Sequence, residues 1–115
     1  MEIKDIAKSI EKELNTFELM YQECKTNDVE MLSDILTYSL SQKSKKIRPL
    51  LTILVAKACG GLSDSTYRSA IIVELLHTAS LAHDDVLDNS DLRRNQPTIN
   101  SRWGNNAAIL YGDYL

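Results

Sequence analysis

The stretch "YRSAIIVELLHTASLAHDDVLD", residues 67–88, runs for more than twenty positions without glycine or proline. Ser63 or Asp64 just before it is a residue type that caps helix N-termini, so the sequence predicts one helix from there to about Asn89. No other feature constrains the fold as strongly. A chain of 115 residues is long enough for one modest domain and too short for two, so this helix is expected to be part of a single domain.

The rest of the sequence also predicts helices. Apolar residues recur at three- and four-residue steps from Ile3 to Cys24, which predicts one long amphipathic helix. Asn27 or Asp28 can cap a second helix that reaches Leu40, and Pro49 fits the first turn of a third. The third, "PLLTILVAKAC", is apolar on almost every side, so we expect it to be buried and to end at Gly60-Gly61. A last helix begins near Asn105 or Asn106.

Strand signals are absent from the sequence. No alternation bounded by hairpin turns appears, and "SDLRRNQPT", residues 90–98, is expected to be a loop because Pro97 disfavours helix at Gln96. The predicted fold class is therefore all-α. The final helix lacks a C-cap glycine and a basic last turn, which indicates that the chain is truncated.

Composition excludes several classes of protein. Hydrophobic residues make up 43% of the chain, enough for a packed core, and the net charge of −3 provides no general positive field for nucleic acid or anionic lipid. Cys24 and Cys59 form no CxxC pair, which argues against a zinc site and a disulfide framework. Because no signal peptide or membrane-spanning segment is apparent, we expect a cytoplasmic protein.

Acidic residues gather at the end of the central helix. At 100° per residue, His77, Leu81, Asp84 and Asp88 share one face, and Asp85 lies at its edge. Carboxylates one turn apart suit Mg²⁺ that keeps several waters and takes its other ligands from a phosphate. A solvated acidic surface is the alternative for these acids alone. His77 is either a ligand or a hydrogen-bonded structural residue, and His83 points elsewhere and is expected to pack or bond locally.

Two basic clusters accompany the acids. Arg93 and Arg94 follow them after a short loop and can clamp phosphate oxygens in bidentate fashion. The second cluster, here called the basic element, is "KSKKIR", residues 43–48, just before the helix that Pro49 begins. Cations at a helix N-terminus oppose the helix dipole unless an anion binds there. The sequence therefore predicts two phosphate sites, one with metal and one without.

These motifs together resemble the trans-type polyprenyl (isoprenyl) diphosphate synthases. "SKKIRP" is similar to the family's GKR-x-RP element, "ELLHTASLAHDD" to its helix leading into the acids, and "DDVLD" with the following "RR" to its first aspartate-rich motif. The resemblance runs from about Lys45 to Leu115 and includes the closing "YGDYL". It implies an antiparallel helical bundle of the isoprenoid synthase type, of which residues 1–115 are the N-terminal part. It also implies that the protein is a homodimer.

The resemblance also implies the roles of the site residues. Asp84, Asp85 and Asp88 would hold Mg²⁺ that bridges the allylic diphosphate, which Arg93 steadies, and these four would carry the catalysis. The diphosphate of isopentenyl diphosphate would bind to Lys45, Arg48, His77 and Arg94. The product would be long, because the small residues Ala79 and Ser80 lie a turn behind the acids, where relatives that stop early resemble one another in carrying bulky aromatics.

The sequence also departs from the family. Ser44 replaces the glycine of the lysine-rich element, Lys46 replaces the arginine beside its lysine, and the family's second aspartate-rich motif lies beyond Leu115. We therefore expect residues 1–115 alone to be inactive. One rival hypothesis is a non-catalytic helical subunit of a synthase complex. Another is a terpene cyclase, which also uses DDxxD, although it has no second diphosphate for the basic element to hold.

Overall fold

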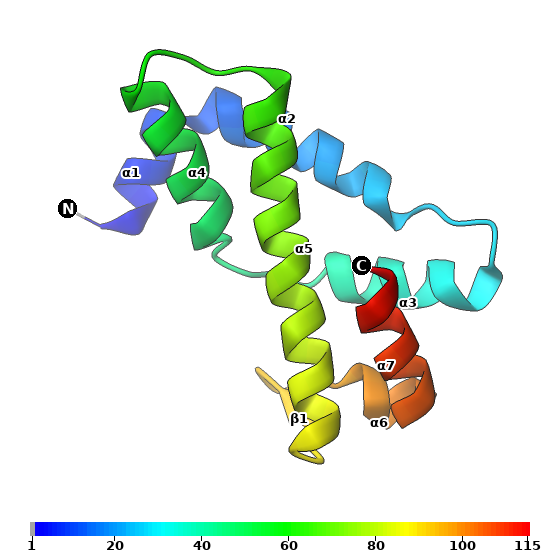
Figure 1. Ribbon diagram of the computed structural model, residues 1–115. Helices are drawn as coiled ribbons and strands as arrows, with labels where there is room; N and C mark the ends of the chain where they lie inside the picture. The colour runs from blue at the N-terminus through cyan, green and yellow to red at the C-terminus, as the bar shows by residue number, and fades with distance from the viewer. Residues whose placement is uncertain (1) are drawn as a thin grey trace. The chain divides into compact units, whose positions relative to one another are not determined.

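The computed structural model describes residues 2–115 and is built almost entirely from helices (Figure 1). The elements are α1 (Ile3–Ser9), α2 (Glu11–Gln22), the 3₁₀ turn η1 (Glu23–Lys25), α3 (Glu30–Leu40), α4 (Ile47–Ala58), α5 (Asp64–Leu87), β1 (Leu92–Arg93), β2 (Gln96–Pro97), α6 (Ile99–Trp103) and α7 (Asn105–Tyr114). The predicted all-α class is confirmed. Along residues 2–115, no helix combines the length and the apolar character needed to cross a bilayer.

The chain divides into two compact units. Unit 1 consists of the residues up to Thr26 together with Lys43–Glu74, and unit 2 of Asn27–Gln42 together with Leu75–Leu115. Helix α5 begins in unit 1 and ends in unit 2. The metal-binding residues predicted from the sequence all lie in unit 2, and the basic element lies in unit 1.

Unit 1 contains α1, α2, α4 and the first part of α5. Its buried side chains include Phe17 and Tyr21, whose rings stack with centroids 5.4 Å apart, and Leu50 and Ile53 of α4. The prediction of one helix from Ile3 to Cys24 was wrong. Ile10 interrupts it with φ −125° and ψ 34°, and its side chain is only 2% exposed. Burial of Ile10 therefore accompanies a bend that helical periodicity alone does not predict.

Helix α4 confirms one prediction and corrects another. Pro49 lies in its first turn, and Gly60 and Gly61 follow its end with φ of 119° and 149°, a conformation open to glycine. The expectation that the helix is buried on all sides was wrong, because Leu51 and Val55 are 54% and 59% exposed. Only one side of α4 is covered in the described chain.

Unit 2 packs α3 beside α6 and α7, as Figure 1 shows for the cyan and red helices. Its buried side chains include Leu36 and Leu40 of α3 and Tyr111 of α7. At the surface of this unit the guanidinium of Arg102 lies 4.4 Å from the centroid of the Tyr38 ring and 4.5 Å from that of Trp103. The short helix α6 was not predicted.

A hairpin with two strands of two residues each connects α5 to α6. The expectation of a loop without strands was therefore wrong. Leu92 pairs with Pro97 and Arg93 with Gln96 in antiparallel register. The turn residues Arg94 and Asn95 have φ of 51° and 64°, the positive values of a type I′ turn. Strands of two residues are too short to produce alternation, and an arginine at a turn position that favours Asn or Gly concealed the hairpin.

Candidate functional site

The acidic motif lies at the end of α5, as its sequence predicts. Asp84 and Asp88 are both exposed, and the Asp88 amide donates to the Asp84 carbonyl at 2.8 Å, which keeps them one helical turn apart. Asn89 follows with φ 52°, a left-handed conformation that ends the helix. Two carboxylates on one turn therefore face solvent at the C-terminus of the longest helix.

Asp85 behaves differently from its two neighbours. It is only 6% exposed and accepts two hydrogen bonds from Arg93, one from Nε at 3.1 Å and one from Nη2 at 2.7 Å. This bidentate pair is the main cause that raises the pKa of the Arg93 guanidinium above its usual value. Both carboxylate oxygens of Asp85 thus accept hydrogen bonds from Arg93, a partner that the sequence motif did not reveal.

Further hydrogen bonds hold the hairpin to the end of α5. The Thr98 hydroxyl and the Asn100 amide both donate to the Ser90 carbonyl, at 2.8 and 2.9 Å, and the Thr98 amide donates to the Asp91 carbonyl at 2.9 Å. Thr98 is 3% exposed and also caps α6 by accepting from the Ser101 amide. Ser90, Thr98 and Asn100 were not predicted from the sequence, although a threonine before a short helix is a recognisable N-cap.

The two arginines of the hairpin have separate environments. Arg93 keeps part of its guanidinium available, because the pair with Asp85 uses two of its five N–H donors. Arg94 is exposed in the left-handed turn, and within residues 2–115 no acidic side chain forms an ion pair with it. A charged side chain held in a conformation that costs free energy is typical of functional positions.

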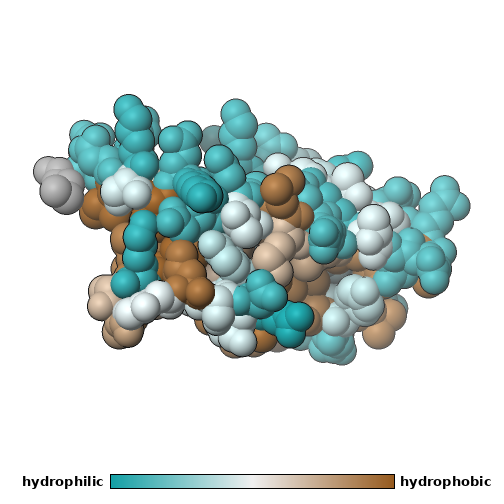
Figure 2. Space-filling view, turned by 90° about the horizontal axis from the view of Figure 1, so that it is seen from above, coloured by the Kyte–Doolittle hydropathy of each residue, from teal (hydrophilic) through white to brown (hydrophobic). Residues whose placement is uncertain are grey.

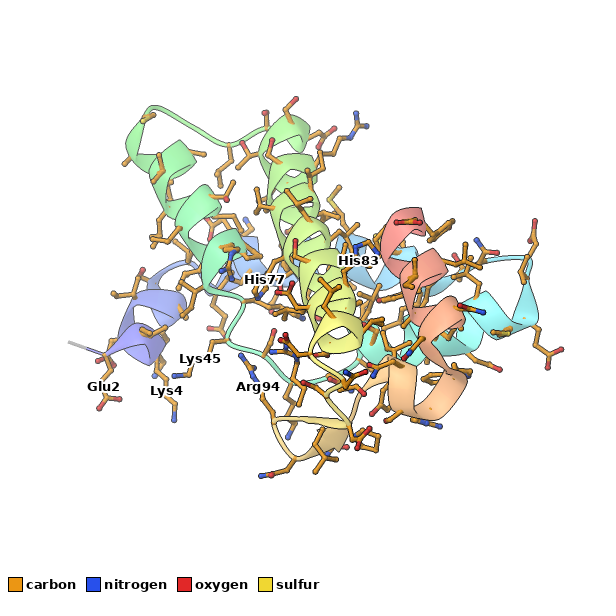
Figure 3. The ribbon with its side chains drawn as sticks, turned by 60° about the horizontal axis from the view of Figure 1, so that its bottom comes forward. Glu2, Lys4, Lys45, His77, His83 and Arg94 are labelled. Atoms are coloured by element: carbon orange, nitrogen blue, oxygen red, sulfur yellow. The ribbon has the colours of Figure 1, made fainter. Side chains whose placement is uncertain are left out.

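The two histidines of α5 point to different sides of that helix (Figure 3). His83 faces α7, where its Nε2 lies 3.1 Å from the Ile109 carbonyl oxygen and 3.3 Å from Asp113 Oδ1, so the predicted local bonding is confirmed. His77 is half-buried on the other side. Its part in substrate binding stays a prediction.

The two predicted chain-length residues differ in exposure. Ala79 is 9% exposed, whereas Ser80 lies at the surface of α5 and donates its hydroxyl proton to the Leu76 carbonyl at 2.9 Å. At 100° per residue, Ser80 lies within about 40° of Asp84 around the helix axis, and Ala79 lies on another side. Only Ser80 therefore shares the exposed side of the acids.

The donor set fits magnesium in part. In the described residues, no three histidine, cysteine, aspartate or glutamate side chains are grouped closely enough to hold a metal ion. Asp84 and Asp88 nevertheless provide two exposed oxygen donors on one turn, and Mg²⁺ is often bound by one or two carboxylates plus waters and substrate phosphates. Asp85, turned to Arg93, is the weakest of the three predicted ligands.

The basic element lies in unit 1, and its cationic side chains have different environments. Lys43, Lys45 and Arg48 are exposed, which leaves their charges accessible to an anion. Lys46 instead turns inward, and its Nζ lies 2.9 Å from both carboxylate oxygens of Glu18 in α2. Sequence analysis did not identify Glu18, because it lies 28 residues from its partner.

Comparison with known proteins agrees with these features. The family model for polyprenyl synthetase matches residues 29–115. The chain is 39% identical over 89 residues to octaprenyl diphosphate synthase of Escherichia coli strain K12, covering 77% of this chain and 28% of the relative. It is 34% identical over 113 residues to all-trans-nonaprenyl-diphosphate synthase (geranyl-diphosphate specific) of Rhodobacter capsulatus, covering 97% and 35%.

A solved structure extends the similarity to the fold. The crystal structure of a polyprenyl synthase from Caulobacter crescentus CB15, complexed with calcium and isoprenyl diphosphate, matches with a TM-score of 0.92 and 28% identity. The match covers 98% of this chain and 34% of that one. The chain thus spans about a third of the length of the relatives it matches.

Proposed function

The chain belongs to the polyprenyl synthetase family, and from this we propose that the protein carrying it is a magnesium-dependent prenyltransferase. It extends an allylic diphosphate with isopentenyl diphosphate units to a long-chain polyprenyl diphosphate. Residues 1–115 form the N-terminal part of its single all-α domain. We further propose that the protein is a cytoplasmic homodimer.

One observation carries this proposal. At the end of α5, the exposed pair Asp84 and Asp88 lies next to a hairpin that Asp85 holds through Arg93 and that presents Arg94 to solvent. Aspartates alone would repel a diphosphate, and a site made only of arginines would bind a diphosphate without aspartates beside it. The combination suits a diphosphate that arrives with a divalent cation.

Each side chain has a role in the proposed reaction. The bond between C1 of the allylic substrate and its diphosphate oxygen breaks, and a new bond forms from C1 to the terminal alkene carbon of isopentenyl diphosphate. Loss of a proton then regenerates a double bond, and pyrophosphate departs. Arg93 stabilises charge on the oxygens of the allylic diphosphate, and the diphosphate of the isopentenyl partner is held by Lys45, Arg48, His77 and Arg94.

Magnesium would be held by Asp84 and Asp88. Bound there, it would neutralise negative charge on the departing diphosphate. Asp85 acts on this site mainly by keeping Arg93 in place, since its two oxygens already accept from that guanidinium. The Caulobacter crescentus polyprenyl synthase, whose crystal structure is complexed with calcium and isoprenyl diphosphate, supports a divalent cation and a diphosphate as the ligands.

A direct assay tests the proposal. The full-length protein that carries this sequence is incubated with labelled isopentenyl diphosphate, a series of allylic diphosphates, and Mg²⁺ or EDTA. We expect Mg²⁺-dependent long products, and we expect Asp84→Asn or Asp88→Asn to lower kcat by about 100-fold or more. Asp91→Asn, an exposed acid next to the motif, is the control and should leave kcat unchanged. No product with any primer would favour the non-catalytic subunit.

Product length supplies a second test. An allylic tail anchored near Asp84 runs back along α5, which rises ~1.5 Å per residue, and the small side chain of Ser80 leaves its path open. Ser80→Phe should therefore shorten the product, measured by chromatography of the dephosphorylated prenols. Ala79 lies on another side of the helix and is buried, so Ala79→Phe should mainly lower stability, by roughly 1–3 kcal/mol. Unchanged product length in Ser80→Phe would exclude this path.

A further inference from the structure

Lys46 is the member of the basic element whose charge is already used inside the protein. Its Nζ contacts both oxygens of Glu18 at 2.9 Å and lies 4.6 Å from the centroid of the Tyr21 ring. Its side chain is 19% exposed, whereas Lys45 and Arg48 are exposed. An ammonium with this carboxylate partner has little left to offer a phosphate, so the inward lysine and the outward cations have different tasks.

The backbone at Lys46 gives this contact a further consequence. Lys46 has φ 45° and ψ 49°, the left-handed conformation that is unfavourable for a residue with a side chain, and it is the N-cap of α4. The chain turns at this residue from an irregular segment, residues 43–46, into the helix. The direction of the turn decides where Lys45 and Arg48, on either side of it, point.

Little else supports the segment from inside. Ser44, Lys45 and Lys46 line a cavity of about 220 Å³ together with Phe17, Glu18 and Leu50, so this part of the chain is not closely packed on the core of unit 1. From this segment, Lys46 reaches α2 through two hydrogen bonds to Glu18. The ion pair therefore restrains the turn.

The pKa and the hydrogen bonds of the Glu18 carboxylate suit it for an ion pair with Lys46. Burial by itself would raise the pKa of Glu18, but hydrogen bonds from Lys46 and Gln22 outweigh it and hold the pKa below its ordinary value. The Gln22 amide donates to the same carboxylate at 2.9 Å and fixes its orientation one turn further along α2. Glu18 is thus charged and oriented at neutral pH.

We propose that Glu18 is a positioning residue for the basic element: through Lys46 it holds the left-handed turn that presents Lys45 and Arg48 to the diphosphate of the isopentenyl substrate. The inference rests on the proposed function for the identity of that ligand. It assigns Lys46 to the framework, although it belongs to the same run of cations as the two ligands.

Substitutions at both ends of the pair test the proposal in the full-length protein. Glu18→Gln and Lys46→Met should each raise KM for isopentenyl diphosphate about fivefold, the factor that corresponds to roughly 1 kcal/mol. KM for the allylic diphosphate and kcat should change less than twofold. The double variant should match either single one, because both remove the same contact. Lys46→Arg keeps the charge and should restore most of the affinity.

The chain offers a matched control. Lys57 and Glu13 form a second ion pair between α4 and α2, at 3.0 Å, at the other end of α4 from the basic element. Glu13→Gln should leave KM for isopentenyl diphosphate unchanged. Lys45→Met, which removes a proposed ligand, should raise it more than Glu18→Gln does. Amide hydrogen exchange of residues 43–48 should be faster in Glu18→Gln and unchanged in Glu13→Gln.

Several results would overturn the proposal. Unchanged KM in Glu18→Gln, even with faster exchange, would show that the turn does not control binding. A loss in Lys46→Met as large as in Lys45→Met, with Glu18→Gln unaffected, would make Lys46 a ligand itself. A wild-type protein without transferase activity would contradict the proposed function instead, and hydrogen exchange in Glu18→Gln would still decide whether Glu18 positions the element.

Discussion

The contact between His83 and Gly112 leaves no space for a side chain at residue 112. A Cβ atom there would lie 2.3 Å from His83 Nε2 and 2.6 Å from its Cδ2, far inside van der Waals contact. His83 is held in this place by the Ile109 carbonyl and by Asp113, both on α7. The glycine of "YGDYL" is therefore a packing requirement of the helix that carries the aspartates.

Gly112→Ala is expected to destabilise the protein. In an ordinary helix interior the change would stabilise by up to ~1 kcal/mol. Here the His83 ring must leave its position and lose its bonds, so we expect a loss of roughly 1–3 kcal/mol in the free energy of unfolding, measured with urea. His83→Ala in the same background should recover part of this loss, which a double-mutant cycle measures. A more stable Gly112→Ala protein would contradict the packing described.

Single residues show how far the sequence predicts the site. Helical periodicity was enough to place Asp84 and Asp88 on one turn, because both depend only on the regularity of α5. The partners of Asp85 and Lys46 were not predictable in this way. Arg93 reaches Asp85 of α5 from the hairpin that follows this helix, and Glu18 reaches Lys46 from another helix. Each pair therefore depends on the fold of its unit.

At the scale of elements, the packing of α7 beside α3 buries a phenol. Tyr111 is 1% exposed, and its hydroxyl makes no hydrogen bond of ordinary geometry. Burial raises the pKa of Tyr111 to about 12 from 10, and Ser39 of α3 opposes the rise only in part. The folded state thus prefers the neutral phenol more strongly than the unfolded state does.

The raised pKa of Tyr111 makes the stability of the protein fall at high pH. Its contribution to the free energy of unfolding is fully present below pH 10, where the unfolded phenol is neutral, and is lost as the pH rises through the folded pKa near 12. Over this range wild type should lose roughly 2–3 kcal/mol more than Tyr111→Phe, measured by urea unfolding at each pH. At pH 7 the variant should be about as stable as wild type, since no hydrogen bond is removed. Parallel pH profiles would contradict this account.

Elements also differ in how well the sequence predicts them. Helix α5 and the ends of α4 were predicted because uninterrupted apolar sequence and a proline or glycine pair are local signals. The bend at Ile10, the hairpin and α6 were missed. The hairpin also depends on a contact between distant residues, the bond from the Tyr38 hydroxyl of α3 to the Pro97 carbonyl.

At the scale of the whole molecule, the described surface carries many large apolar side chains. Figure 2 shows hydrophobic groups between hydrophilic ones on the face it displays. Those more than half exposed include Leu19 of α2, Leu51 and Val55 of α4, Ile72, Leu76 and Leu87 of α5, Leu92 of β1 and Leu110 of α7. Where such residues form a contiguous patch, the patch is typical of a surface that contacts other parts of a protein or a second chain.

Helix α5 is shared by the two compact units, with residues up to Glu74 in one and from Leu75 in the other. A helix is cooperative along its length, because each backbone hydrogen bond is formed against a turn that already exists. Fraying that starts at Asp64 can therefore spread along the backbone toward the aspartates, so the order of the acidic turn depends in part on the first turns of its own helix.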